Sequence, residues 1–143
     1  MYDTRSNVVT RSLNDSALQP LDLVEMRRQL GEDEELVSDL MALFLSDYLG
    51  RLESLTAALD ARDADGVRSV AHTIKGGASN LCARGVTEAA RALENVCAHE
   101  DFAAIRAHAD RLAAEVERLA KALRGFQLER PGDATGTIRG SAL

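Results

Sequence analysis

Apolar residues recur at spacings of three and four along most of the chain, which is the period of helices that bury one face. The pattern divides residues 21–124 into one short and four long helical segments. The segments are expected at residues 21–30, 33–62, 64–81, 84 or 86–97, and 102–124. No segment alternates polar and apolar residues for long enough to predict a strand. Since short connections favour antiparallel neighbours, the expected fold is all-α, an antiparallel four-helix bundle with a short N-terminal capping helix.

The longest expected helix, residues 33–62, has an apolar stripe with one polar interruption at Asp47. Its members are expected to be Leu36, Leu40, Leu43, Phe44, Leu52, Leu55 and Leu59. Gly50 lies inside this pattern and weakens the expectation of an unbroken helix. Asp63 is the expected N-cap of the next helix, whose apolar residues share one face. Those residues are Val67, Val70, Ile74, Ala78 and Leu81.

The two ends of the chain differ from its middle. Residues 1–20 and 125–143 are polar and hold no sustained apolar period. We expect a disordered leader or linker at the start and a flexible tail from Gly125 onward. The 143 residues then hold one folded domain, residues 21–124, which is long enough to bury a core without disulfides or metals.

The formal net charge of −6 comes entirely from residues 21–124, because each terminal stretch holds two acids and two bases. An acidic domain is a poor candidate for binding nucleic acid, which relies on Lys and Arg contacts with phosphate. The chain has no secretory start and no apolar run near ~18 residues, so we expect a cytoplasmic protein without direct membrane contact. Cys82 and Cys97 lack metal-ligand spacing and are expected to be reduced thiols.

The segment 64–81 carries the most informative polar residues. His72 lies two residues before Ile74, so it points away from the apolar face of the expected helix. Lys75, Gly76 and Ser79 follow His72 at three, four and seven positions, which places all four residues on one outward stripe. The stripe therefore carries an exposed imidazole, a cation one turn further on and a patch of bare backbone.

The pair Gly76-Gly77 is unusual inside a helix, because each glycine costs about 1 kcal/mol relative to alanine. Its presence suggests that a partner surface approaches the helix closely there. A neutral imidazole is a good nucleophile near neutral pH, and Lys75 could offset the charge of an anionic group attached to it. The combination suggests a phosphoryl group carried on His72.

The run AHTIKGGASNLCA at residues 71–83 resembles the signature of histidine phosphotransfer (HPt) domains, roughly A-H-x-[LI]-K-G-[SGA]-[AS]-x-x-[LV]-G-A. The matching residues are Ala71, His72, Ile74, Lys75, Gly76, Gly77, Ala78, Leu81 and Ala83. The flanking helical segments also resemble the family, so the likeness covers residues 21–124. Cys82 departs from the pattern, since the family usually has glycine there, where it helps the turn after the helix.

The resemblance implies a phosphocarrier of a multistep two-component relay rather than an enzyme. His72 would be the phosphoacceptor, Lys75 would stabilise the phosphate, and Gly76, Gly77 and Ser79 would lie where partners dock. The implied partners are response-regulator receiver domains and a hybrid sensor kinase, with the chain itself a monomer. No cofactor is expected, because Mg²⁺ would be held by the partner receiver domain and the chain has no nucleotide-binding motif.

Other interpretations stay open at this point. His72 could be an ordinary surface histidine of a helical interaction module that works without phosphate, or part of a dimerising histidine-kinase bundle. The chain lacks an ATP-binding domain and has more than two helices, which argues against the kinase bundle. His99 and His108 have no telling neighbours, and the consecutive residues 99–101 do not converge as metal ligands do.

Overall fold

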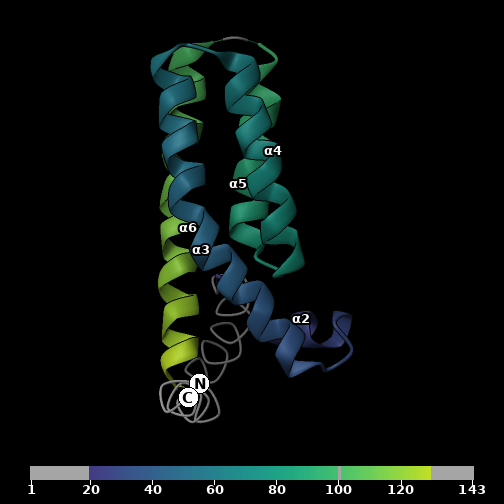
Figure 1. The fold of residues 1–143 in the computed structure, drawn as a ribbon. Coiled ribbons are helices and arrows are strands. Elements are labelled where there is room, and N and C mark those ends of the chain that lie inside the picture. The colour runs from purple at the N-terminus through teal and green to yellow at the C-terminus, as the bar shows by residue number, and fades with distance from the viewer. Residues whose placement is uncertain (1–19, 100, 130–143) are drawn as a thin grey trace, which may run out of the picture.

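The computed structural model describes residues 20–99 and 101–129, and every regular element in these ranges is a helix (Figure 1). The helices are α2 (Leu23–Gln29), α3 (Glu34–Asp60), α4 (Ala64–Asn80), α5 (Arg84–Cys97) and α6 (Phe102–Glu129). The all-α class that the apolar periodicity predicts is confirmed.

Aspartates at three helix starts explain where α2, α3 and α4 begin. Asp22, Asp33 and Asp63 each accept a hydrogen bond from the backbone N–H three residues later, at 3.0, 3.1 and 3.0 Å. Such caps satisfy N–H groups that have no partner within the helix. The predicted N-cap Asp63 is therefore confirmed, and it fixes the start of the helix that carries His72.

The four long helices contact one another in a closed ring, in which α3 packs on α4, α4 on α5, α5 on α6 and α6 on α3. Figure 1 shows α3 beside α6 and α4 beside α5, with α2 next to the N-terminal half of α3. Apolar side chains of these four helices meet inside the ring, and Met26 of α2 belongs to the same buried cluster. The largest of those that are almost wholly buried are Met26, Met41, Leu81, Leu93, Ile105, Leu112, Leu119 and Leu123.

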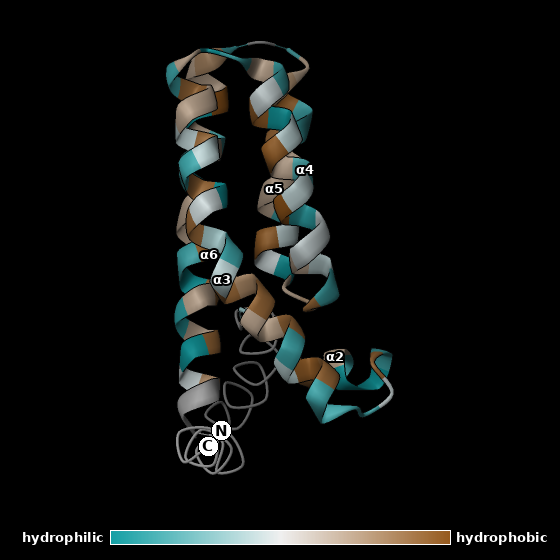
Figure 2. Ribbon diagram, in the orientation of Figure 1, coloured by the Kyte–Doolittle hydropathy of each residue, from teal (hydrophilic) through white to brown (hydrophobic). Residues whose placement is uncertain are grey.

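The buried face of α3 differs from the stripe that its leucines predict. Leu55 and Leu59 are buried as expected, but Leu36 and Leu43 are 39% and 56% exposed. The core instead receives Val37, Met41 and Tyr48, which lie one position further around the helix. A tyrosine is tolerated there because Arg124 donates a hydrogen bond of 2.9 Å to its hydroxyl. Leu36 and Leu43 are thus left on the outer surface of the N-terminal half of α3. Figure 2 shows that this half of the helix includes a run of hydrophobic residues, coloured brown.

Two helix boundaries also differ from expectation. The helix α3 runs through Gly50 without a break. The last helix continues past Gly125 to Glu129, so residues 125–129 are helical rather than part of a tail. Phe126 still packs against the core there, and tertiary packing outweighs the modest helix cost of one glycine. The rest of the expected tail, residues 130–143, and residues 1–19 of the expected leader lie outside the described residues.

The turn after α4 uses a left-handed backbone conformation at Cys82, whose φ is +54°. This is the position where the HPt signature usually has glycine, so the departure leaves a side chain where glycine is favoured. The carbonyl oxygen of Cys82 accepts a 3.1 Å hydrogen bond from the backbone N–H of Asp22. The turn therefore fixes the end of α4 against the chain that leads into α2.

We predict that Cys82→Gly raises the free energy of unfolding by about 0.5–1 kcal/mol, because glycine adopts a positive φ without steric cost. Urea unfolding followed by circular dichroism measures the change. The control is Cys82→Ala, which removes the thiol but keeps the strained backbone and should give no gain. Equal stabilisation by both variants would show that the thiol, rather than the backbone, is unfavourable.

Candidate functional site

The helix α4 presents His72 on its outer face. On the opposite face, Val67, Ala71, Ile74 and Ala78 are 0–5% exposed, which confirms most of the predicted apolar face. The His72 side chain is 72% exposed. Burial of one face of α4 therefore fixes the rotation of the helix and directs the imidazole outward.

The carboxylate of Glu94, on α5, joins His72 and Lys75. His72 Nδ1 lies 2.9 Å from Glu94 Oε2, and Lys75 Nζ lies 2.6 Å from Glu94 Oε1. The Glu94 side chain is only 16% exposed, so these contacts are partly shielded from water. One carboxylate thus links two residues of α4 across the packed pair of helices.

The pKa of Glu94 is lowered from its ordinary value of 4.5. Partial burial is the largest single influence and acts to raise the pKa. The hydrogen bonds from Lys75 and His72, together with the positive charge of Lys75, outweigh it. The carboxylate is therefore ionised at neutral pH and can only accept hydrogen bonds.

This ionisation decides which nitrogen of His72 carries the proton. Because the Glu94 carboxylate only accepts, Nδ1 of His72 must donate the hydrogen bond between them. In a neutral imidazole the other nitrogen, Nε2, then has a free lone pair. The arrangement leaves an exposed ring nitrogen that can act as a nucleophile.

The other residues of the predicted site, Lys75, Gly76, Gly77 and Ser79, differ in their exposure and in their contacts. Lys75 is half-buried and paired with Glu94, rather than free on the outward stripe. A Cβ placed at Gly76 or Gly77 would meet nothing within 4 Å, so both lie beside open space. Ser79 is exposed, and its hydroxyl has no hydrogen-bond partner among the residues that the structure describes.

Glu94 is the site residue that the sequence interpretation missed. A signal for it exists, because Glu94 lies at the border of the apolar face of α5, directly after the buried Leu93 and four residues after the buried Ala90. The sequence does not indicate the contact between the two side chains, because Glu94 lies 22 positions after His72 in the chain.

The remaining candidates form no further site. Burial raises the pKa of the Cys82 and Cys97 thiols, so neither is a reactive thiolate near neutral pH. Within residues 20–99 and 101–129, no three His, Cys, Asp or Glu side chains gather as metal ligands do. No helix in the same ranges is long and apolar enough to cross a membrane.

The family model of the Hpt domain matches residues 39–122, which include most of α3, all of α4 and α5, and most of α6. The chain belongs to the Hpt domain family. His72, Lys75 and Glu94 all lie within the matched range. The resemblance that the motif at residues 71–83 indicates is thereby confirmed.

A solved structure agrees with this assignment. The Hpt chain is similar to the crystal structure of histidine-containing phosphotransfer protein B (HptB) from Pseudomonas aeruginosa PAO1, with a TM-score of 0.70 and 27% sequence identity. The likeness covers 79% of this chain and 99% of the HptB chain. A search of curated proteins found no match.

We predict that Glu94→Gln lowers the free energy of unfolding at pH 7 by about 1 kcal/mol, because a charge-assisted link between two helices is lost. A lowered carboxyl pKa stabilises the fold above the ordinary pKa and loses that contribution as the pH falls through the native value. The difference between wild type and variant should therefore shrink below pH 4.5, as urea unfolding at pH 7 and at lower pH would measure. Glu88→Gln is the control, since Glu88 is exposed on the same helix and has no ion pair among the described residues. A difference that is constant with pH would contradict the assignment of charge to Glu94.

Proposed function

We propose that this Hpt domain is a phosphocarrier of a multistep two-component phosphorelay, with the phosphoryl group carried on Nε2 of His72 between receiver-domain aspartates. The observation that supports this most directly is the imidazole itself, 72% exposed, with Nδ1 occupied by Glu94 and Nε2 free. Membership of the Hpt family and the similarity to HptB point to the same chemistry.

The transfer step follows from the state of the imidazole. The Nε2 lone pair of His72 attacks the phosphorus of the receiver's phospho-aspartate in line, so an N–P bond forms as the P–O bond breaks. The electron pair of the broken bond returns to the aspartate carboxylate. Nδ1 keeps its proton throughout, and the positive charge that develops on the ring is balanced by Glu94, 2.9 Å away. Return of the phosphoryl group to a second receiver reverses these steps.

Lys75 has two roles in this proposal. Before transfer its ammonium lies 2.6 Å from Glu94 Oε1 and holds the carboxylate in place for His72. After transfer the phosphoryl group brings negative charge to the same helix face, one turn from Lys75. A lysine side chain is long and flexible, so its ammonium can turn from Glu94 to the phosphoryl oxygens and offset their charge.

The surroundings of His72 suit the approach of a receiver domain. Gly76 and Gly77 leave the backbone of α4 uncovered beside His72, and Ser79 offers a free hydroxyl one turn further on. We propose that receiver domains and a hybrid sensor kinase use this face, that Mg²⁺ is supplied by the receiver, and that the domain acts as a cytoplasmic monomer without kinase activity of its own. The proposed scaffold is an antiparallel four-helix bundle capped by α2, which the ring of helix contacts supports.

The first test is phosphotransfer from a pre-phosphorylated receiver domain to wild type and to His72→Gln. Wild type should become labelled and the variant should not, and the label should be acid-labile and alkali-stable as a phosphoramidate is. His99→Gln is the matched control, because His99 is also exposed but lies outside the site, and it should be labelled like wild type. ATP and Mg²⁺ alone should label none of the three proteins.

Label on His72→Gln would refute the assignment of the phosphoacceptor. Absence of label on wild type with every receiver tested would favour the phosphate-independent interaction module of the same fold.

The second test concerns Glu94 as a positioning residue. Glu94→Ala should slow transfer by about tenfold, because Nδ1 of His72 loses the acceptor that fixes its proton. Glu94→Gln should keep most of the rate, since its amide oxygen still accepts that hydrogen bond. The ¹⁵N chemical shifts of the His72 ring report the tautomer directly, and should show proton loss from Nδ1 only in Glu94→Ala. An unchanged tautomer in Glu94→Ala would remove this role from Glu94.

A further inference from the structure

The outer face of α4 carries a second cation beside His72. Arg68 precedes His72 by four residues and Lys75 follows it by three, so the imidazole has a basic residue about one turn away in either direction along the helix. At about 100° per residue, the seven positions between Arg68 and Lys75 bring them within roughly 20° of each other around the axis. Both cations therefore lie on the same side of His72, the side on which Lys75 contacts Glu94 of α5.

The thiol of Cys97, on α5, also places Arg68 on this side. Burial is the main reason that the pKa of the Cys97 thiol is raised. The positive charge of Arg68 lowers that pKa, whereas the negative charges of Asp65 and Glu94 raise it further. Since only nearby charges shift a pKa in this way, Arg68 and Glu94 lie around the same part of α5.

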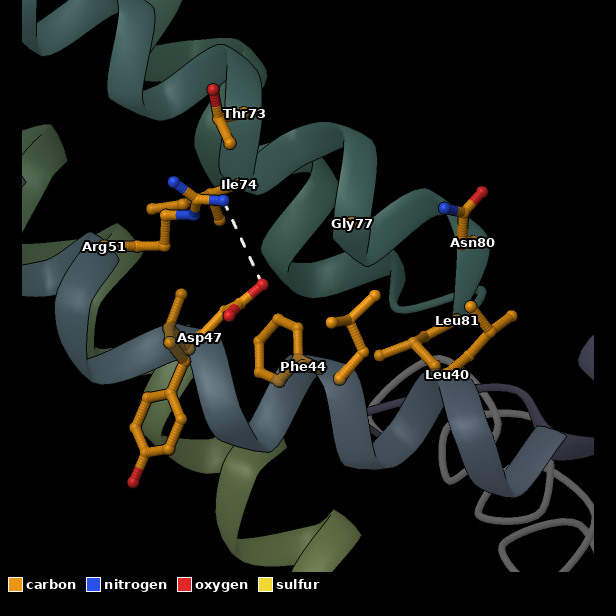
Figure 3. Close-up of a pocket in the computed structure, with 12 residues that line it drawn as sticks. Leu40, Phe44, Asp47, Arg51, Thr73, Ile74, Gly77, Asn80 and Leu81 are labelled. Carbon is orange, nitrogen blue, oxygen red and sulfur yellow. Dashed lines mark ion pairs between the residues drawn. The ribbon is translucent and has the colours of Figure 1, made fainter. Parts of the chain in front are cut away.

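The opposite side of α4 faces α3 and has its own arginine. A pocket opens there between the two helices, and Thr73 and Gly77 of α4 line it (Figure 3). Arg51 of α3 lines the same pocket and lies 4.0 Å from Asp47. Thr73 is displaced from His72 by about 100° around the helix axis, in the direction opposite to Lys75. Arg51 therefore approaches α4 from the other side than the one that carries Arg68.

The ion pair of Arg68 is much looser than that of Lys75. Arg68 Nη2 lies 3.7 Å from Asp65 Oδ1, and the two side chains are 58% and 93% exposed. An exposed pair of this kind adds little stability, so the guanidinium can leave Asp65 at little cost. By contrast, Lys75 Nζ lies 2.6 Å from Glu94, whose side chain is only 16% exposed.

The charges around a phosphorylated His72 call for a further cation. A phosphoryl group brings roughly two negative charges. The ring that keeps its Nδ1 proton supplies one positive charge, and the charge of Lys75 is already matched by Glu94. One negative charge is then left unbalanced. Because side chains on a helix lean toward its N-terminus, the imidazole of His72 lies over the turn that contains Arg68.

We propose that Arg68 leaves Asp65 and binds the phosphoryl oxygens once the phosphoryl group is on His72. This inference rests on the proposed phosphotransfer function, because it concerns the phosphorylated state of the same site. The planar guanidinium can donate two parallel hydrogen bonds to phosphoryl oxygens, which the ammonium of Lys75 cannot do. Asp65 holds Arg68 in the unphosphorylated protein and competes with the phosphoryl group for it.

The first variant, Arg68→Gln, removes the guanidinium. Phosphoramidate labels an imidazole without any receiver, and ³¹P NMR then measures the pKa of the phosphoryl group on His72. Loss of Arg68 should raise that pKa by about 0.5–1 pH unit, because a nearby cation favours the dianion. The rate of labelling should fall about threefold or more. Arg28→Gln is the matched control and should behave like wild type, because Arg28 is also an exposed arginine paired with an acid three residues earlier, Glu25 on α2.

The second variant, Asp65→Asn, removes the competing acid. It frees Arg68, so it should lower the phosphoryl pKa and speed labelling by roughly twofold, in keeping with the small strength of an exposed ion pair. Glu25→Gln is its control and should have no effect, since Glu25 pairs with Arg28 rather than with Arg68. A purely structural ion pair would be broken by either change, so effects of the same sign in Arg68→Gln and Asp65→Asn would overturn the proposal.

The conservative variant Arg68→Lys tests whether the charge at this position reaches the phosphoryl group. Lysine keeps the charge but not the planar fork, so the phosphoryl pKa and the labelling rate should lie between those of wild type and Arg68→Gln. Values equal to those of Arg68→Gln would show that a cation here does not act on the phosphoryl group, and would overturn the proposal.

Transfer from a phosphorylated receiver separates this inference from the function on which it rests. A receiver that labels wild type at His72, together with an unchanged phosphoryl pKa and labelling rate in Arg68→Gln, would overturn the role of Arg68 and leave the phosphotransfer function intact. Failure of every receiver to label wild type would overturn the function and this inference with it.

Discussion

The burial of one face of α4 is the constraint on which the rest of the site depends. Val67, Ala71, Ile74 and Ala78 are almost inaccessible to water, so the helix cannot rotate without exposing them. This rotation places His72 outward, Lys75 toward α5 and Gly77 toward α3. The burial of a single face of α4 therefore determines the direction of the imidazole and also which residues of α4 face α5 and α3.

The Glu94 carboxylate connects this packing to chemistry. It is buried enough for its hydrogen bonds to be strong, but its two partners keep its pKa low and the group ionised. An ionised acceptor at Nδ1 leaves Nε2 of His72 unprotonated, and the same anion lies close to the ring when positive charge develops there. The cost is a negative charge near the place where a phosphoryl group would sit, which Lys75 is positioned to offset.

In α3, the residues that the tertiary structure buries differ in part from those that the apolar pattern of the sequence predicts. Leu55 and Leu59 enter the core as the leucine stripe suggests, but nearer the N-terminus of α3 the core receives Val37, Met41 and Tyr48, and Leu43 remains at the surface. The Tyr48 hydroxyl finds a donor in Arg124, 76 residues away in the chain, which makes its burial acceptable. The displaced leucine lines a pocket between α3 and α4 together with Gly77.

The sequence by itself determined the helical class, the N-cap at Asp63, the inward face of α4, and the outward direction of His72. These features depend on periods of three and four residues and on local capping, which act within one helix. Only the tertiary structure decided that Glu94 holds His72 and Lys75, which face of α3 is buried, and that a pocket opens beside Gly77. The physical reason is that these features arise where side chains from different helices meet, and the distance between such side chains depends on how the helices pack rather than on any local pattern.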